Sequence, residues 1–167
     1  KLSKAQFYDW RDELLKQDYL VNVASLTEQK NHELLIHVYS RVVRHFPDLK
    51  LVLVGKGEKE SEIRCLCNKL GLDIYGDGER SRSVICSSQV FFLGFQENPY
   101  PFIENSRLFV MTSHWEGMPI TLLESMALGK PIVISDCSSS VRRVMSDKLF
   151  NVSDDAKKFC ERTKYGY

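Results

Sequence analysis

The sequence predicts an α/β protein with a doubly wound parallel sheet and helices on both faces. Short apolar runs recur along the chain, each is continuously hydrophobic rather than alternating, and helical patterns lie between them. Continuous apolar runs are typical of strands that helices cover on both faces. A regular alternation of strands and helices is typical of a parallel sheet.

Five apolar runs are the predicted strands, and the first is the weakest of them. They are Leu20–Val23, Leu51–Val54, Val90–Leu93, Leu108–Met111 and Ile132–Ile134. After Met145 the pattern fades into polar residues, so no further element is predicted there.

Two helices are predicted around the first strand. An opening helix over 5–17 places Phe7, Trp10 and Leu14 on one face. A second helix follows Asn31, a residue type that commonly caps helix N-termini. Its apolar residues recur at helical spacing: Leu34, Leu35, Val38, Val42 and Phe46.

Two later helices have clear stop signals. Ile63, Leu66 and Leu70 repeat at helical spacing, and Gly71 follows as a stop. Pro119 fits the first turn of a helix that continues through Leu128 and ends at Gly129. The segment 73–89 between these helices is predicted to be a long, mobile polar loop.

Length and charge limit the classes of function. At roughly 150 residues per domain, the 167 residues fit a single domain over 1–167. The net charge of +1 offers no basic face for nucleic acid or acidic lipid. No apolar run is long enough to span a membrane. We expect a cytoplasmic protein, and because it starts at Lys1 we expect a fragment of something longer.

The five cysteines are predicted to be reduced thiols, because they are odd in number and lack a secretory context. They are Cys65, Cys67, Cys86, Cys137 and Cys160. The pair at 65 and 67 has no His or second Cys pair at a zinc-like spacing, so no metal site is expected.

Small and charged residues follow the predicted strands, at the edge where open α/β sheets bind ligands. Gly55-Lys56-Gly57 follows the second strand, where glycines either let backbone N–H groups approach a ligand or simply form a tight turn. Both readings remain open. NAD binding is disfavoured because Glu60 replaces the third glycine and the ribose acid falls near Asp77.

The strongest constellation is Glu116-Gly-Met-Pro-Ile-Thr-Leu-Leu-Glu124. Free N–H groups at a helix start, with its positive dipole end, form an anion site flanked by two carboxylates. An anion beside hydroxyl-binding carboxylates matches a nucleoside diphosphate sugar. Alternatively, both acids only favour the helix dipole, at about 0.3–1 kcal/mol each.

Several segments, in this order, resemble the C-terminal donor-binding domain of retaining glycosyltransferases of the GT-B fold, family-four type. The resemblance covers about 19–145, and its specific part is the pair of glutamates eight residues apart with a Gly-Lys-Pro tail. The segments are Val23–Asn31, Leu51–Gly57, Val90–Phe95, Asn98–Ile103 and Glu116–Pro131.

The resemblance implies a Rossmann-like half of a GT-B enzyme that binds a UDP-sugar without a metal or other cofactor. Glu116 would contact the donor sugar, Lys30 the diphosphate and Glu124 the ribose, with Glu116 and Lys30 as the catalytic pair. The remaining donor-site residues would be Gly117, Met118, Pro119, Ile120, Gly55, Gly57, Gly94, Phe95 and Ser25.

The resemblance also implies a partner domain. The acceptor, a glycan, polysaccharide or lipid-linked saccharide, would bind in an N-terminal domain missing from this chain. We therefore expect this chain alone to bind its donor and transfer nothing. Any membrane association would come through the parent protein, at the inner face of the membrane.

Two departures from the family pattern support an alternative, a non-catalytic domain that keeps the fold. Ser25 stands where the family usually has arginine, and Asp136–Arg143 replaces a turn containing proline and glycine. Loss of one cation from a diphosphate clamp costs about 3 kcal/mol of transition-state stabilisation.

Overall fold

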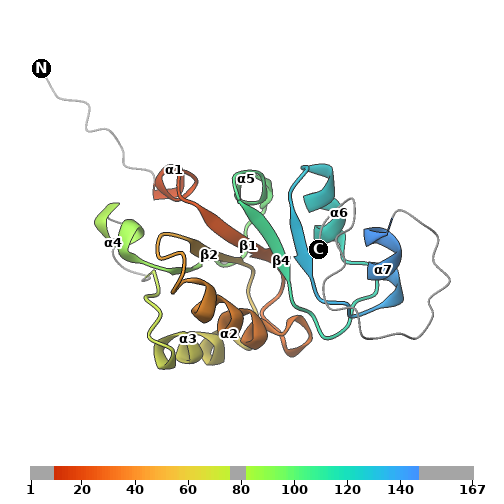
Figure 1. Cartoon of the computed structure of the whole chain (residues 1–167), viewed down its shortest axis with the longest axis horizontal. Coiled ribbons are helices and arrows are strands. Elements are labelled where there is room, and N and C mark those ends of the chain that lie inside the picture. The colour runs from red at the N-terminus through yellow and green to blue at the C-terminus, as the bar shows by residue number, and fades with distance from the viewer. Residues whose placement is uncertain (1–9, 76–81, 147–167) are drawn as a thin grey trace, which may run out of the picture.

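The computed structural model, which describes residues 10–75 and 82–146, contains a five-stranded parallel sheet of order β3-β2-β1-β4-β5 (Figure 1). The strands are β1 (Tyr19–Val23), β2 (Lys50–Val54), β3 (Val90–Phe92), β4 (Leu108–Met111) and β5 (Ile132–Ile134). All five predicted strands and the fold class are confirmed.

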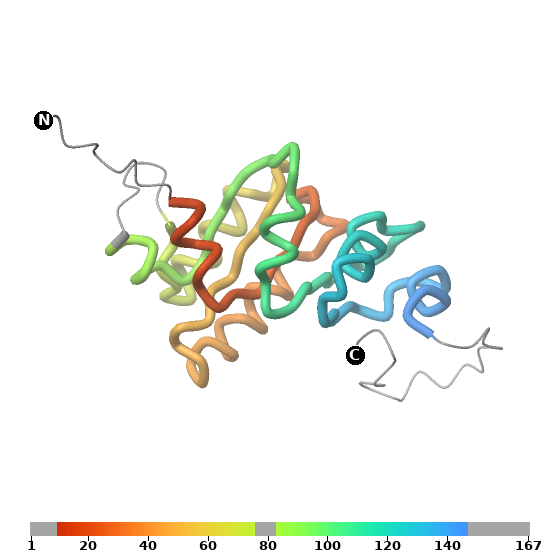
Figure 2. Tube along the Cα trace, turned by 90° about the horizontal axis from the view of Figure 1, so that it is seen from above, coloured from red at the N-terminus to blue at the C-terminus, as the bar shows by residue number. Residues whose placement is uncertain are grey.

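Helices cover both faces of the sheet, with α2 and α3 on one face and α1, α4 and α5 on the other (Figure 1). Figure 2 shows α1, α5 and α6 side by side, with α7 beyond α6 at the β5 end. The helices are α1 (Trp10–Leu14), the 3-10 turn η1 (Glu28–Lys30), α2 (His32–Val42), α3 (Glu60–Lys69), α4 (Arg82–Ser87), α5 (Tyr100–Glu104), α6 (Ile120–Ala127) and α7 (Ser139–Met145).

Alternating side chains of the buried strands divide the core into two clusters. On β2, Leu51 and Leu53 pack with α2 and α3, while Val52 and Val54 pack with the helices of the opposite face. Every residue of β2 is buried, including Lys50, whose ammonium donates to the Cys86 carbonyl at 2.6 Å. This two-sided burial explains why the strands are continuously apolar.

The predicted polar loop over 73–89 was wrong in part. Ile74 forms a bridge with Val90, and α4 occupies 82–87 with Ile85 fully buried. Such a short helix shows almost no periodicity, because one turn and a half carries only two large apolar residues. Residues 76–81 lie outside the described residues.

The apolar face predicted for α2 was also displaced. The helix buries Leu35, Ile36 and Tyr39, whereas Leu34 and Val38 are exposed. The cap was predicted correctly, because the Asn31 side chain accepts a hydrogen bond from the Leu34 N–H at 3.3 Å. Phe46 lies beyond the helix and is exposed.

The helices α3 and α6 end close to their sequence signals, whereas α1 ends at Leu14, three residues before the predicted end at position 17. Gly71 and Gly129 adopt left-handed conformations after α3 and α6, with φ of 69° and 67°. Pro119 precedes α6 as its N-cap rather than lying in the first turn. The predicted opening helix corresponds to α1, and its residues 5–9, with Phe7, lie outside the described residues.

Candidate functional site

The sheet order places a topological switch point between β1 and β4. From β1 the chain moves outward to β2 and β3, whereas β4 pairs on the other side of β1 and leads to β5. In open α/β sheets, ligands bind where the carboxyl ends of such strands diverge. Two loops leave β1 and β4 here, 24–31 and 112–119.

These two loops are joined by hydrogen bonds. The His114 N–H donates to the Gln29 carbonyl at 2.8 Å, and the Gln29 side chain donates to the Trp115 carbonyl at 2.8 Å. The Thr112 hydroxyl donates to the Asn31 carbonyl at 3.0 Å. Backbone and side-chain bonds therefore fix the loop after β1 against the loop after β4.

The joined loops bring together the two residues predicted to be catalytic. Lys30 Nζ lies 2.6 Å from Glu116 Oε1, although the residues are 86 positions apart in sequence. The Ser113 hydroxyl donates to the same oxygen at 2.6 Å. The Glu116 side chain is only 5% exposed and that of Lys30 18%, so water screens this pair less than a surface pair.

Glu124 lies in the second turn of α6, where its carboxylate accepts a hydrogen bond from the Tyr100 hydroxyl at 3.1 Å. This bond raises the pKa of the Tyr100 phenol. Glu124 thus holds a hydroxyl group in the structure, which is the chemistry predicted for it toward a ribose.

The start of α6 lies between the two glutamates in sequence. Pro119 is extended. The N–H groups of Ile120 and Thr121 lie in the first turn of the helix, where N–H groups have no acceptor within the helix itself. Gly117 and Met118, in the approach to the helix, are exposed. These groups and the helix dipole favour an anion at this end of α6.

The structure explains Gly55 and Gly57 by chain packing. A Cβ on Gly55 would lie 1.9 Å from the Ala24 carbonyl oxygen, and one on Gly57 would lie 2.2 Å from that of Leu26. The Gly55 N–H donates to the Gly94 carbonyl. Close approach of two backbones therefore requires glycine at both positions, and a role of their N–H groups toward a ligand stays a prediction.

The remaining predicted donor-site residues lie in loops at the same edge of the sheet. Gly94 has a φ of 66° and lies two residues after the end of β3, and Phe95 is 70% exposed. Ser25 is exposed in the loop after β1. Their roles toward a nucleotide stay predictions.

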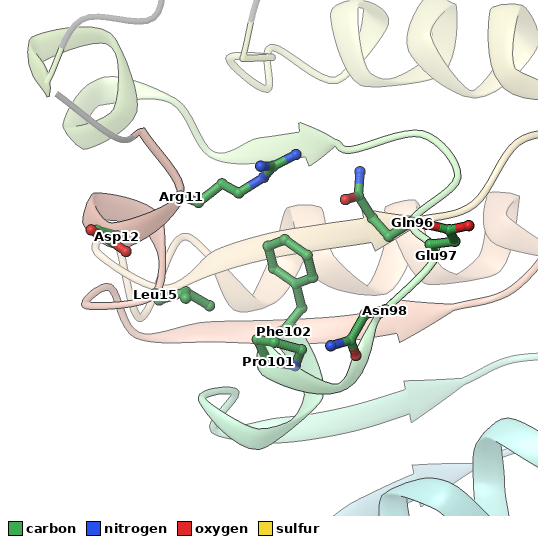
Figure 3. A pocket seen from close by; sticks show the side chains of 8 residues that line it. All are labelled: Arg11, Asp12, Leu15, Gln96, Glu97, Asn98, Pro101 and Phe102. Atoms are coloured by element: carbon green, nitrogen blue, oxygen red, sulfur yellow. The ribbon is translucent and has the colours of Figure 1, made fainter. Parts of the chain in front are cut away.

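A separate hollow of about 350 Å³ lies between α1 and the loop that precedes α5. Figure 3 shows Phe102 at its centre, with α1 side chains at one end and loop side chains at the other. It is lined by Arg11, Asp12, Leu15, Gln96, Glu97, Asn98, Pro101 and Phe102. None of the predicted site residues lines this hollow.

Sequence reasoning missed the groups that support the pair. Ser113 and Thr112 directly follow β4, so the rule that polar residues at strand ends face the ligand could have found them. Gln29 and Tyr100 had no such signal, because their partners are 86 and 24 residues away in sequence.

Within residues 10–75 and 82–146, no group of three His, Cys, Asp or Glu side chains is arranged to hold a metal ion. In the same part of the chain, every helix is too short or too polar to cross a membrane. Cys65, Cys67, Cys86 and Cys137 are free, and Cys160 lies outside the described residues.

A doubly wound parallel sheet with polar loops at its switch point is the architecture of nucleotide-binding α/β proteins. The family model described as glycosyl transferases group 1 matches residues 8–159. The chain therefore belongs to the group 1 glycosyltransferases, which confirms the resemblance inferred from the sequence.

Relatives with similar sequences are also named as glycosyltransferases. The chain is 35% identical, over 80% of its length, to an uncharacterized glycosyltransferase of Methanocaldococcus jannaschii, and covers 29% of that protein. It is 32% identical, over 84% of its length, to a Campylobacter jejuni enzyme named N-acetylgalactosamine-N,N'-diacetylbacillosaminyl-diphospho-undecaprenol 4-alpha-N-acetylgalactosaminyltransferase, and covers 34% of it. The chain thus spans about a third of these relatives.

Solved structures agree on the fold. A mutant of S. aureus TarM, in complex with Fondaparinux, alpha-GlcNAc-glycerol and UDP, matches 78% of this chain with a TM-score of 0.66 and 24% identity, over 24% of its own length. Anabaena HepE, in complex with UDP-glucose, matches 79% of this chain with a TM-score of 0.61 and 21% identity, over 33% of its own length. These matches support a Rossmann-like domain of the GT-B type.

Proposed function

We propose that this chain is the donor-binding half of a retaining glycosyltransferase and binds a UDP-sugar at the β1–β4 switch point. The observation that carries the proposal is the contact between Lys30 and Glu116, two residues from separate loops that meet beside the start of α6. The complexes of TarM with UDP and of HepE with UDP-glucose make UDP the nucleotide to test.

Lys30 and α6 would stabilise the leaving group. As the bond between the sugar and the diphosphate breaks, the sugar becomes oxocarbenium-like and negative charge grows on the diphosphate. The Lys30 ammonium and the N–H groups at the start of α6 are placed to stabilise that charge. Without ligand, Glu116 provides the counter-charge for the largely buried Lys30 ammonium.

The two glutamates would hold hydroxyl groups of the donor. Glu116 would orient the sugar rather than attack it, and Glu124 would exchange the Tyr100 hydroxyl for those of the ribose. The backbone of Gly94 and Phe95 would lie beside the base. Acceptor binding and transfer would require a further domain, which agrees with the chain's spanning about a third of its relatives.

Calorimetric titration of the 167-residue chain with UDP tests this proposal. We expect saturable binding that Lys30→Met weakens about 10- to 100-fold, since a charge-assisted hydrogen bond contributes about 1.5–3 kcal/mol. The control is Lys16→Met, at a lysine whose side chain is 70% exposed. Folded protein that gives no heat with millimolar UDP would contradict the proposal.

Ser25 favours a second candidate, a domain that keeps donor binding but has lost catalysis. This residue is exposed in the loop after β1, where the family pattern places an arginine. A Ser25→Arg variant of the full-length protein distinguishes the candidates. Transfer by the natural protein supports an active enzyme, whereas transfer only by the variant supports a degenerate one.

A further inference from the structure

A buried hydrogen-bonded chain connects β4, β1 and the start of α2 beneath the proposed site. The Asn22 side-chain amide donates to the Val110 carbonyl at 2.8 Å, and its oxygen lies 2.9 Å from His32 Nε2. Both side chains are 1% exposed. Three separate elements are therefore locked together by one polar network in the core.

The network determines which nitrogen of the His32 ring carries the proton. The Asn22 amide nitrogen donates to the Val110 carbonyl, so the amide oxygen is the atom that faces the ring. An amide oxygen can only accept a hydrogen bond. His32 Nε2 therefore carries a proton and donates it. Among the described residues, the other ring nitrogen, Nδ1, is buried and has no hydrogen-bond partner. Burial also lowers the pKa of His32 to about 4, so the ring is neutral near pH 7.

His32 is the first residue of α2, and it follows directly on Lys30 and Asn31. Asn31 holds a left-handed conformation, with φ of 48°, between the η1 turn that ends at Lys30 and the helix. From the β4 side, the Thr112 hydroxyl donates to carbonyl oxygens of the same turn. It lies 3.3 Å from the Lys30 carbonyl oxygen and 3.0 Å from that of Asn31. The turn that carries Lys30 is thus anchored on two sides.

We infer that His32 and Asn22 are positioning residues for Lys30. They anchor the left-handed turn so that the Lys30 ammonium points at Glu116 and at the donor diphosphate. This inference rests on the proposed function for the identity of the ligand. A neutral ring serves the role, because a second cation next to Lys30 would repel it and compete for Glu116.

Replacement of the ring tests the inference. His32→Phe keeps the bulk of the ring and removes the bond to Asn22, and we expect the dissociation constant of UDP for the 167-residue chain to rise about 10-fold. His32→Gln keeps a side-chain N–H donor, and we expect it to stay within about 3-fold of the natural protein. The control is His37→Ala, at an exposed histidine of the same helix.

A double-mutant cycle separates positioning from general stability. If His32 acts through Lys30, His32→Phe changes UDP affinity by less than about 2-fold in a Lys30→Met background, whereas it lowers the melting temperature equally in both backgrounds. Unchanged affinity in folded His32→Phe, or the same 10-fold effect without Lys30, overturns the inference.

A second measurement does not depend on UDP. Labelling of lysines with an amine-reactive reagent, read by mass spectrometry, should be about 5-fold faster at Lys30 in His32→Phe and unchanged at exposed Lys16. If the natural protein does not bind UDP but this labelling changes as expected, the proposed donor is wrong and the positioning role stands. Equal labelling of Lys30 in both proteins overturns the positioning role.

Discussion

At the scale of single residues, the site consists of groups that satisfy one another until a ligand arrives. Glu116 accepts from both Lys30 and Ser113, and Glu124 accepts from Tyr100. A donor would replace water and these internal partners with its own phosphates and hydroxyls. The free energy of binding is therefore a difference between two sets of hydrogen bonds, and single substitutions should have moderate effects.

Glu124 should select for ribose. If its carboxylate holds the vicinal hydroxyls, the chain binds UDP about 10-fold more tightly than 2′-deoxy-UDP, because one charge-assisted hydrogen bond is lost. Glu124→Gln should remove most of this preference, and competition calorimetry with both nucleotides measures it. A preference that survives in Glu124→Gln assigns ribose recognition to another residue.

His32 makes stability depend on pH. Burial, and to a smaller extent the charge of Lys30, lower the pKa of His32 from 6.5 to about 4. The unfolded chain binds a proton more readily than the folded one, so stability is intact above pH 6.5 and falls as the pH drops toward 4.

Denaturant unfolding at two pH values measures this dependence. Between pH 7 and about pH 4.5 we expect the natural chain to lose about 2–3 kcal/mol more stability than His32→Gln. Parallel losses in the two proteins would show that the buried ring does not resist protonation.

At the scale of elements, the backbone approach between the loops after β1 and β2 requires glycine. At Gly57 a Cβ would meet the backbone of Leu26 at distances of 2.2 to 2.8 Å, which no rotamer change can relieve. Leu26 belongs to the same loop as Lys30 and lies four residues before it. A change in packing at Gly57 would therefore displace the backbone of the loop that carries Lys30.

Gly57→Ala should lower the free energy of unfolding by about 2–4 kcal/mol, because the loop after β2 must move away from the loop after β1. Gly117→Ala is the matched control, since no atom of the residues that the structure describes lies within 4 Å of its Cβ position. It should change stability by less than about 0.5 kcal/mol. Urea denaturation of the three proteins gives both values. Equal stabilities would contradict the packing account of the glycine loop.

The sequence predicted elements well where a local pattern encodes them. The inner strands were found because both of their faces are buried, and β5 was found from a short apolar run in which Val133 is 39% exposed. Gly71, Gly129 and the Asn31 cap marked helix ends through their conformational preferences. The helix α4 was missed because two apolar residues in six define no period. Short helices are held by tertiary packing, which a single sequence does not display.

At the scale of the whole molecule, the site depends on the strand order. Spacing along the chain pointed to Glu116 and Glu124 as one unit around a helix start. It could not show that Lys30 reaches Glu116 across 86 residues, because that contact follows from the pairing of β1 with β4. Nor could it reveal the Tyr100 bond or the Asn22–His32 network, whose partners come from different elements.

In the parallel sheet all strands end on the same side, and none of the site residues predicted there lines the hollow. Within the described residues, a nucleotide titration can distinguish two places. One is the switch point between β1 and β4, and the other is the hollow between α1 and the loop before α5.

Chemical-shift mapping of the backbone amides during a UDP titration decides between these places most directly. The account predicts the largest shifts at Lys30, Gly117, Ile120 and Thr121, with saturation at one common dissociation constant. Shifts concentrated at Leu15, Gln96 and Phe102, with Lys30 and Ile120 unmoved, would contradict it.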